Sequence, residues 1–293
     1  MKKLLPLLAI IFSCIFFLSA CKKNSVDEQY IETVHPVIPD LSTQVIASVA
    51  GFITDEQGNA ITGAIVKGSA VTVTTDDYGY FRITNASFAK SAGFVQVTRS
   101  GYFTGYRTFL PIAGKETFIR LQLIPKTITA IISATTGGTV STADGAAITL
   151  PSNAVVTAST NTAYTGTVNV YAHWLNPIDQ QTPQNMPGDL RGIDSSGYLN
   201  ALITYGMLAV ELTGNAGELL QIAAGKKASL SFPIPASLLG TAPASIPLWY
   251  FNESNGLWKQ DGAAAKTGRE SLPPLYAARH KKRQASRREY CRE

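Results

Sequence analysis

After residue 20, the sequence consists of short apolar stretches separated by turn residues, and this spacing constrains the fold more than any other feature. Residues 49–55 alternate apolar and polar side chains, as a half-buried strand does, and a turn containing Gly58 follows. No long apolar stripe with helical spacing follows the leader, and charged residues, at 15% of the chain, are too sparse to suggest solvated helices. The sequence therefore predicts an all-β fold of sandwich type.

Residues 1–20 have the pattern of an export signal. Two lysines are followed by an apolar run, and small residues stand directly before Cys21. This pattern resembles the lipobox of bacterial lipoproteins, which implies cleavage before Cys21, a diacylglycerol on its thiol and acylation of the new amino terminus. The alternative is an uncleaved transmembrane helix. The apolar run lies at the short limit of about 17 residues for a span and contains Pro6, so cleavage is favoured.

Lipidation at Cys21 implies where the protein is located. Two or three acyl chains anchor a protein durably, whereas one chain gives marginal binding. We expect membrane lipid to be a partner through Cys21, with residues 21–45 as a polar tether and the folded body outside the cytosol. The outer membrane is the expected site, and its periplasmic and surface faces both remain open.

The length left after the leader exceeds that of most single domains and predicts two tandem β-sandwich domains, at residues 46–125 and 126–262. With Cys21 lipidated and Cys14 removed, Cys291 is the one thiol left, so we expect no disulfide. The three histidines are far apart in the sequence and form no metal-ligand motif. We therefore expect no metal and no cofactor.

Residues 263–293 form an atypical tail. The chain's net charge of +5 lies wholly in residues 269–293, because the rest of the chain balances its acidic and basic residues. The basic isoelectric point is therefore no evidence for a nucleic-acid partner. Strand alternation is expected to stop at residue 269. Two explanations stay open: a frameshift that replaced a closing strand, and a genuine basic extension that contacts anionic lipid or polysaccharide.

A set of turn and strand residues in the first predicted domain resembles one known family. The matching residues are Gly51, Asp55, Gly58, Ala64, Val66, Thr75, Asp76, Gly79, Phe81, Gly101 and Tyr102. Together they resemble the carboxypeptidase regulatory-like domain. The resemblance implies a transthyretin-like β-sandwich that is a non-catalytic module. Acidic residues at 55–56 and 76–77 suggest either calcium ligands or turn-capping side chains, and the Gly that follows each pair favours turns.

The second predicted domain resembles a module found after that same domain in other proteins. The matching segments are 137–138, 150–151, 164–166, 186–190, 205–207, 210–212, 233–235 and 248–251, with Trp258. They resemble the extracellular β-rich region of FAM171-type membrane proteins and of cartilage intermediate layer protein. The early part also resembles ZU5-type sandwiches. No ligand follows from either resemblance.

One loop is a candidate contact surface. Met186, Pro187, Gly188, Asp189 and Arg191 lie between predicted strands, and binding residues concentrate on loops held by a rigid scaffold. The alternative is ordinary turn chemistry, in which the carboxylate of Asp189 pairs with the guanidinium of Arg191.

Aromatic residues form a second candidate site. Trp174, Trp249 and Trp258 could stack on glycans, and the last two flank a predicted hairpin. The alternative is that they pack in sandwich cores. His173, next to Trp174, is a lone histidine with no nucleophile motif, because the chain contains no Gly-x-Ser-x-Gly sequence.

These observations predict a protein that is not an enzyme: a membrane-anchored binding, adhesion or scaffolding module outside the cytosol, whose partner is a surface protein or polysaccharide. The alternative function is a carbohydrate-binding accessory lipoprotein of a transporter or hydrolase system. A hydrolase or self-cleaving protein is a third class, for which the sequence offers no nucleophile with an identifiable base.

Overall fold

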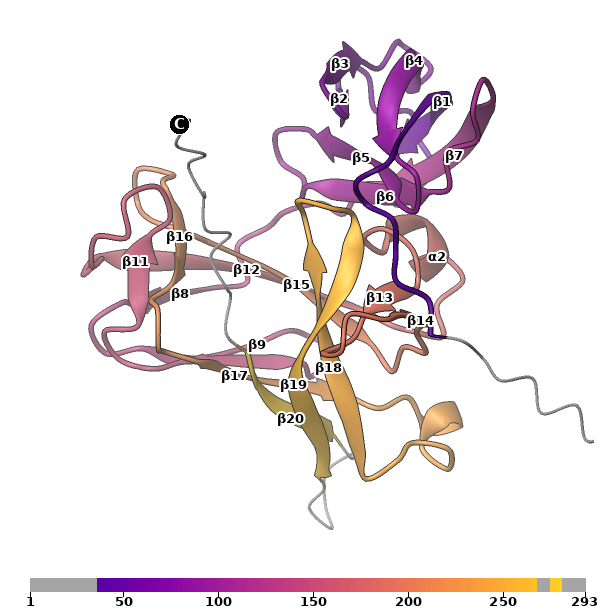
Figure 1. The fold of residues 1–293 in the computed structure, drawn as a ribbon. Coiled ribbons are helices and arrows are strands. Elements are labelled where there is room, and N and C mark those ends of the chain that lie inside the picture. The colour runs from indigo at the N-terminus through magenta and orange to yellow at the C-terminus, as the bar shows by residue number, and fades with distance from the viewer. Residues whose placement is uncertain (1–35, 268–274, 281–293) are drawn as a thin grey trace, which may run out of the picture. The chain divides into compact units, whose positions relative to one another are not determined.

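The computed structural model describes residues 36–267 and 275–280, and nearly all of their regular structure is β-strand (Figure 1). The leader and Cys21 lie outside the described residues. Two short helical segments interrupt the strands, α2 (Thr182–Asn185) and the 3-10 turn η2 (Ala236–Leu238). Neither of these helices, nor any other in the described ranges, has the length and hydropathy needed to cross a bilayer.

Strands β1 to β7 form two sheets, which we call the first sandwich. Their bounds are β1 (Gln44–Thr54), β2 (Ile65–Gly68), β3 (Val71–Thr74), β4 (Tyr80–Ala89), β5 (Gly93–Thr98), β6 (Gly105–Phe109) and β7 (Glu116–Gln122). The three-stranded sheet has the order β4-β1-β7, and the four-stranded sheet has the order β3-β2-β5-β6. Strand β1 pairs antiparallel with β4 and parallel with β7, so it is the central strand.

Alternation along each strand fills the space between these two sheets. In β7, Ile119 and Leu121 are buried, whereas Phe118 and Arg120, which alternate with them, are exposed. The inward residues join one apolar cluster in which the rings of Phe88 and Phe109 lie 5.0 Å apart, edge to face. The first sandwich therefore has its own core.

Strands β8 to β20 form two larger sheets, which we call the second sandwich. Their bounds are β8 (Ala130–Ser133), β9 (Gly138–Ser141), β10 (Ala147–Leu150), β11 (Val155–Thr157), β12 (Thr167–Leu175), β13 (Arg191–Ile193), β14 (Leu199–Ala201), β15 (Met207–Thr213), β16 (Leu219–Ile222), β17 (Ala228–Pro233), β18 (Ser245–Asn252), β19 (Leu257–Thr267) and β20 (Leu275–His280). One sheet runs β11-β16-β15-β12-β8. The other runs β14-β13-β19-β20-β17-β10-β9, with β18 beside β19. A shared apolar cluster joins residues of both sheets, among them Ile148 and Val170.

The structure confirms the predicted all-β sandwich fold and corrects the expected end of its strands. Strand β19 continues through the predicted boundary at residue 262 to Thr267, because its register with β18 extends to Ala265. Strand β20 lies within the predicted tail, where alternation was expected to have stopped. It pairs with both β17 and β19, so the backbone groups of these two strands are bonded there. The predicted hairpin is present as β18 and β19, with Phe251 opposite Trp258.

Candidate functional site

The loop predicted as a contact surface, residues 186–191, lies against the first sandwich. Met186 is 8% exposed and packs in an apolar cluster with Phe103 and Leu175. The amide of Gly188 donates a hydrogen bond of 2.9 Å to the carbonyl of Tyr106 in β6. The loop thus adds backbone contacts to the free side of β6, which is the last strand of its sheet.

The predicted pair between Asp189 and Arg191 is present. The Nη2 atom of Arg191 lies 2.7 Å from a carboxylate oxygen of Asp189, and the Asp189 side chain also accepts a bond from the Arg191 amide. A second guanidinium nitrogen of Arg191 donates to the carbonyl of Ser91 at 2.7 Å. The pair therefore has the expected turn geometry and also connects the loop to the first sandwich. Whether the loop binds an external partner stays a prediction.

Arg107, which the sequence did not single out, stabilises the same contact. Its guanidinium donates to the carbonyls of Gln184 and Gly188, at 2.6 and 3.2 Å. Burial lowers the pKa of Arg107, and the nearby negative charge of Asp189 opposes that shift. Hydrogen bonds to two backbone carbonyls compensate part of the desolvation of this cation.

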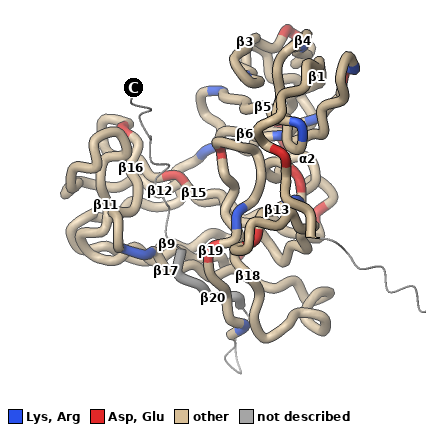
Figure 2. The backbone as a smooth tube through the Cα atoms, in the orientation of Figure 1, with Lys and Arg blue, Asp and Glu red and all other residues tan. Residues whose placement is uncertain are grey.

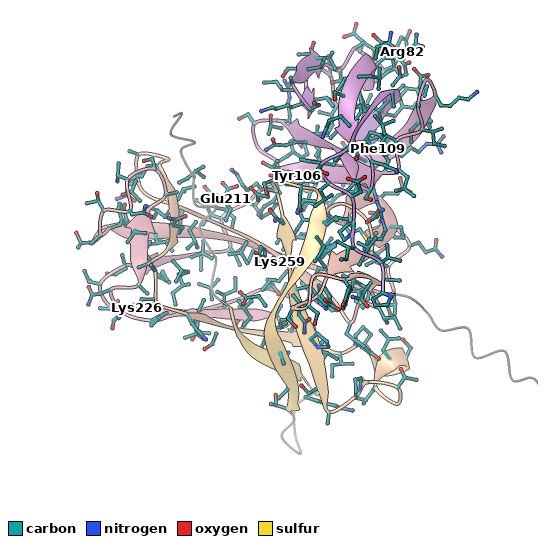
Figure 3. The ribbon with its side chains drawn as sticks, viewed as in Figure 1. Arg82, Tyr106, Phe109, Glu211, Lys226 and Lys259 are labelled. Atoms are coloured by element: carbon teal, nitrogen blue, oxygen red, sulfur yellow. The ribbon has the colours of Figure 1, made fainter. Side chains whose placement is uncertain are left out.

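Aromatic rings complete the contact. The rings of Tyr106 and Phe251 lie 5.0 Å apart, and Trp258 packs edge to face on Phe251 at 5.7 Å. Thr108, next to these rings on β6, donates its hydroxyl hydrogen to the carbonyl of Gly256. Burial and then the charge of Glu253 raise the pKa of the Tyr106 hydroxyl. Figure 3 labels Tyr106 and Phe109, which both belong to β6.

The three tryptophans predicted as glycan contacts lie in different packed environments. Trp258 is 8% exposed, and its Nε1 is buried with no hydrogen-bond partner. Trp174 is half-buried and borders a core cluster that contains Phe232. Trp249 is half-buried, with its six-membered ring beside Gly192. The structure does not bring them together in one exposed surface, and their role in binding stays a prediction.

The carboxylates considered as calcium ligands cap turns. The side chain of Asp55 accepts hydrogen bonds from the amides of Gln57 and Asn59, and that of Asp76 accepts from Tyr78 and Tyr80. The side-chain hydrogen bond from Asn59 holds the pKa of Asp55 below its usual value. The turn interpretation is confirmed. In the part of the chain that the structure describes, no three His, Cys, Asp or Glu side chains gather as a metal site would require.

A shallow groove of about 490 Å³ is lined by Arg99, Lys126 and Glu211, with apolar and hydroxyl side chains beside them. Lys126 forms an ion pair with Glu211 at 2.6 Å, and Arg99 donates to the carbonyl of Gly63 at 3.0 Å. The charged groups that line the groove are thus already engaged. Figure 2 shows that Lys, Arg, Asp and Glu occupy few positions along the described chain, most of which is drawn tan.

The outer surface of the β4-β1-β7 sheet is an exposed aromatic surface that the sequence reasoning missed. Phe118 is 52% exposed, and its ring centroid lies 5.9 Å from that of Phe52. Alternation in residues 117–123 places Phe118 and Arg120 on one side of β7. That signal was visible in the sequence, but it does not reveal whether another part of the chain covers this side.

Comparison with known proteins gives one partial relative. No protein-family model matches the chain. Human cartilage intermediate layer protein 2 is 30% identical over 104 residues, which is 34% of this chain and 9% of that protein. The match supports, over this segment, the resemblance to cartilage intermediate layer protein. Because the chain spans so little of that relative, the resemblance to FAM171-type proteins and the assignment as a lipoprotein stay predictions.

Solved structures give distant likenesses. A candidate carbohydrate-binding protein from Bacteroides uniformis has 10% sequence identity and a TM-score of 0.22, covering 81% of this chain and 99% of that chain. The streptococcal ancillary pilin has 12% identity and a TM-score of 0.20, covering 79% of this chain and 61% of that chain. At these scores the likenesses carry no conclusion about function.

Proposed function

We propose that this chain is a non-enzymatic, membrane-anchored module that binds, adheres or acts as a scaffold outside the cytosol, at the outer membrane. The observation that carries the proposal is the leader, whose small residues stand directly before Cys21. The β-sandwich body supports it, because rigid strands are a scaffold on which exposed side chains keep their positions.

The contacts of several described carboxylates support the non-enzymatic part of the proposal. Asp55 and Asp76 cap turns, and Glu211 is paired with Lys126. These carboxylates therefore serve structure. Turnover of peptide or glycoside substrates by the purified protein would contradict the proposal of a non-enzymatic role.

Substitution of the lipidated cysteine tests the anchor. In the bacterial envelope, Cys21→Ser is expected to abolish labelling by an alkyne-tagged fatty acid and to move the protein from the detergent phase to the aqueous phase. Cys14→Ser, in the same leader, is the matched control and is expected to keep both properties. Unchanged labelling and partitioning of the Cys21→Ser variant would overturn the anchored assignment.

Protease treatment of intact cells tests which face of the outer membrane carries the protein. Digestion of the body on intact cells supports surface display and a partner outside the cell. Protection until the outer membrane is opened supports a periplasmic module. The alternative, a carbohydrate-binding accessory lipoprotein, needs an accessible aromatic surface.

A further inference from the structure

Three aromatic rings cross the outer side of the β4-β1-β7 sheet, and the middle ring, that of Phe52, contacts the other two. Phe52 lies opposite Tyr80 in the antiparallel pair of β1 and β4, with ring centroids 5.5 Å apart. On the other side, Phe52 meets Phe118 of β7 at 5.9 Å. Phe118 is 52% exposed, and the other two rings are half-buried. We call these three rings, with the charged groups described next, the aromatic face.

Charged side chains lie beside the rings: Arg120 is in register with Phe52, and Glu116 precedes Phe118 by two residues in β7. The guanidinium carbon of Arg120 is 5.5 Å from the Phe118 ring centroid, a cation–π contact. Arg82 and Glu116 form an ion pair of 2.6 Å, with 56% and 38% of their side chains exposed. Figure 3 labels Arg82 in the first sandwich. Arg120 forms no ion pair with any described residue, so one positive charge on the face is uncompensated.

The mixture of rings and charges favours a particular kind of ligand. Exposed aromatic patches rimmed by polar groups mark binding sites. Protein–protein interfaces are enriched in aromatic residues and Arg but depleted of Glu, which this face carries as Glu116. A pyranose ring presents a flat side of C–H groups that packs on an aromatic ring and an edge of hydroxyls that exchanges hydrogen bonds with Arg and Glu. An uncompensated guanidinium adds a site for a carboxylate.

We propose that the aromatic face binds an acidic polysaccharide, with pyranose rings packed on Phe118 and Phe52 and a uronate carboxylate held by Arg120. This inference rests on the proposed function and specifies its ligand. The Arg82–Glu116 pair supplies a hydrogen-bond donor and acceptor for ring hydroxyls. The site is limited along β7 by Gln122, which alternation places on the same side of the strand and which is 6% exposed.

Calorimetric titration with a hexameric oligogalacturonide, and with cellohexaose as the neutral comparison, tests the proposal. We expect the full mature chain to bind the acidic hexamer more tightly. Phe118→Ala and Phe118→Leu are each expected to weaken binding by about tenfold or more, because leucine keeps apolar volume but not the flat ring. Arg120→Gln is expected to remove the preference for the acidic hexamer. Ile203→Ala, at an 85% exposed position in the loop after β14, is the control and should leave affinity unchanged.

Several results would overturn the proposal. These are no binding of the acidic hexamer, equal affinity for both hexamers, or equal affinity of the Phe118 variants and the wild type. A dimer in sedimentation analysis that Phe118→Ala dissociates would also overturn it, since a second copy would then be the occupant. Native circular dichroism of each variant excludes unfolding as the cause. None of these outcomes alters lipidation of Cys21, so the two proposals fail separately.

Discussion

The first sandwich has two aromatic surfaces, and one is covered while the other is open. On β6, the ring of Tyr106 packs on Phe251, and Arg107 donates to backbone carbonyls of residues 184 and 188. On the β4-β1-β7 sheet, Phe118 meets Phe52, and Arg120 lies over a ring with no ion-pair partner among the described residues. Both surfaces combine aromatic rings with arginine. Residue type alone therefore does not separate a structural contact from an available surface.

The largest expected effect on stability comes from a substitution that disrupts the covered contact. Gly188 has a φ of +67°, and an added Cβ would overlap the ring of Phe251. Gly188→Ala should lower the free energy of unfolding by about 2–5 kcal/mol, through left-handed backbone strain and overpacking together. Urea unfolding measures the change.

Gly114→Ala is the matched control for that substitution. Gly114 has a φ of +68°, but an added Cβ there would meet nothing within 4 Å. Its substitution should therefore lower the free energy of unfolding by about 1–2 kcal/mol, through backbone strain alone. Equal losses for the two variants would show that the added methyl group at residue 188 is accommodated without overlapping the Phe251 ring.

The second prediction concerns alkaline pH. The pKa of Tyr106 is raised in the folded state, first by burial. Above about pH 10, the unfolded chain loses this proton while the folded chain keeps it, so stability should fall by up to about 1.4 kcal/mol per pH unit. Tyr106→Phe keeps the ring on Phe251 and should reduce this fall. Urea titrations from pH 8 to 11, a range chosen around the usual tyrosine pKa of about 10, measure it. If the free energy of unfolding falls with pH equally steeply in the wild type and in Tyr106→Phe, solvent reaches the Tyr106 hydroxyl in the folded protein.

The smallest expected effect is on the open surface. Phe118→Ala removes a ring that is half-exposed, so the free energy of unfolding should fall by about 1 kcal/mol or less, from lost ring contacts and strand propensity. Thermal and urea unfolding measure it. A loss above about 2 kcal/mol would show that the ring is structurally buried and would remove the contrast between the two surfaces.

The sequence predicted the local chemistry of the loops well. Turn capping by Asp55 and Asp76 follows from Asp near a Gly between two strands, and the structure has these bonds. The pairing of Asp189 with Arg191 is likewise a contact between neighbours in the chain. Such contacts are accessible to sequence reasoning because the partners are two to four residues apart.

Two features of the fold were not predicted, because they depend on pairing between distant segments: strand β20 and the environments of the tryptophans. Strand β20 was not expected, because residues 275–280 are surrounded by basic sequence, yet the gap between β17 and β19 accommodates a strand there. The tryptophans were considered together because they share a chemistry, whereas the fold buries Trp258 and leaves Trp174 and Trp249 half-buried. In both cases long-range pairing decided the outcome.

The sequence by itself determined that this chain is built of strands, because side chains alternate between the two sides of a strand and that period of two can be read directly from the order of residues. Tertiary structure alone decided which aromatic surface is covered. Arg107 and Gly188 are separated by 81 positions, and no local pattern brings them together. Alternation identifies the two sides of each strand, and only packing between distant segments determines which side faces solvent.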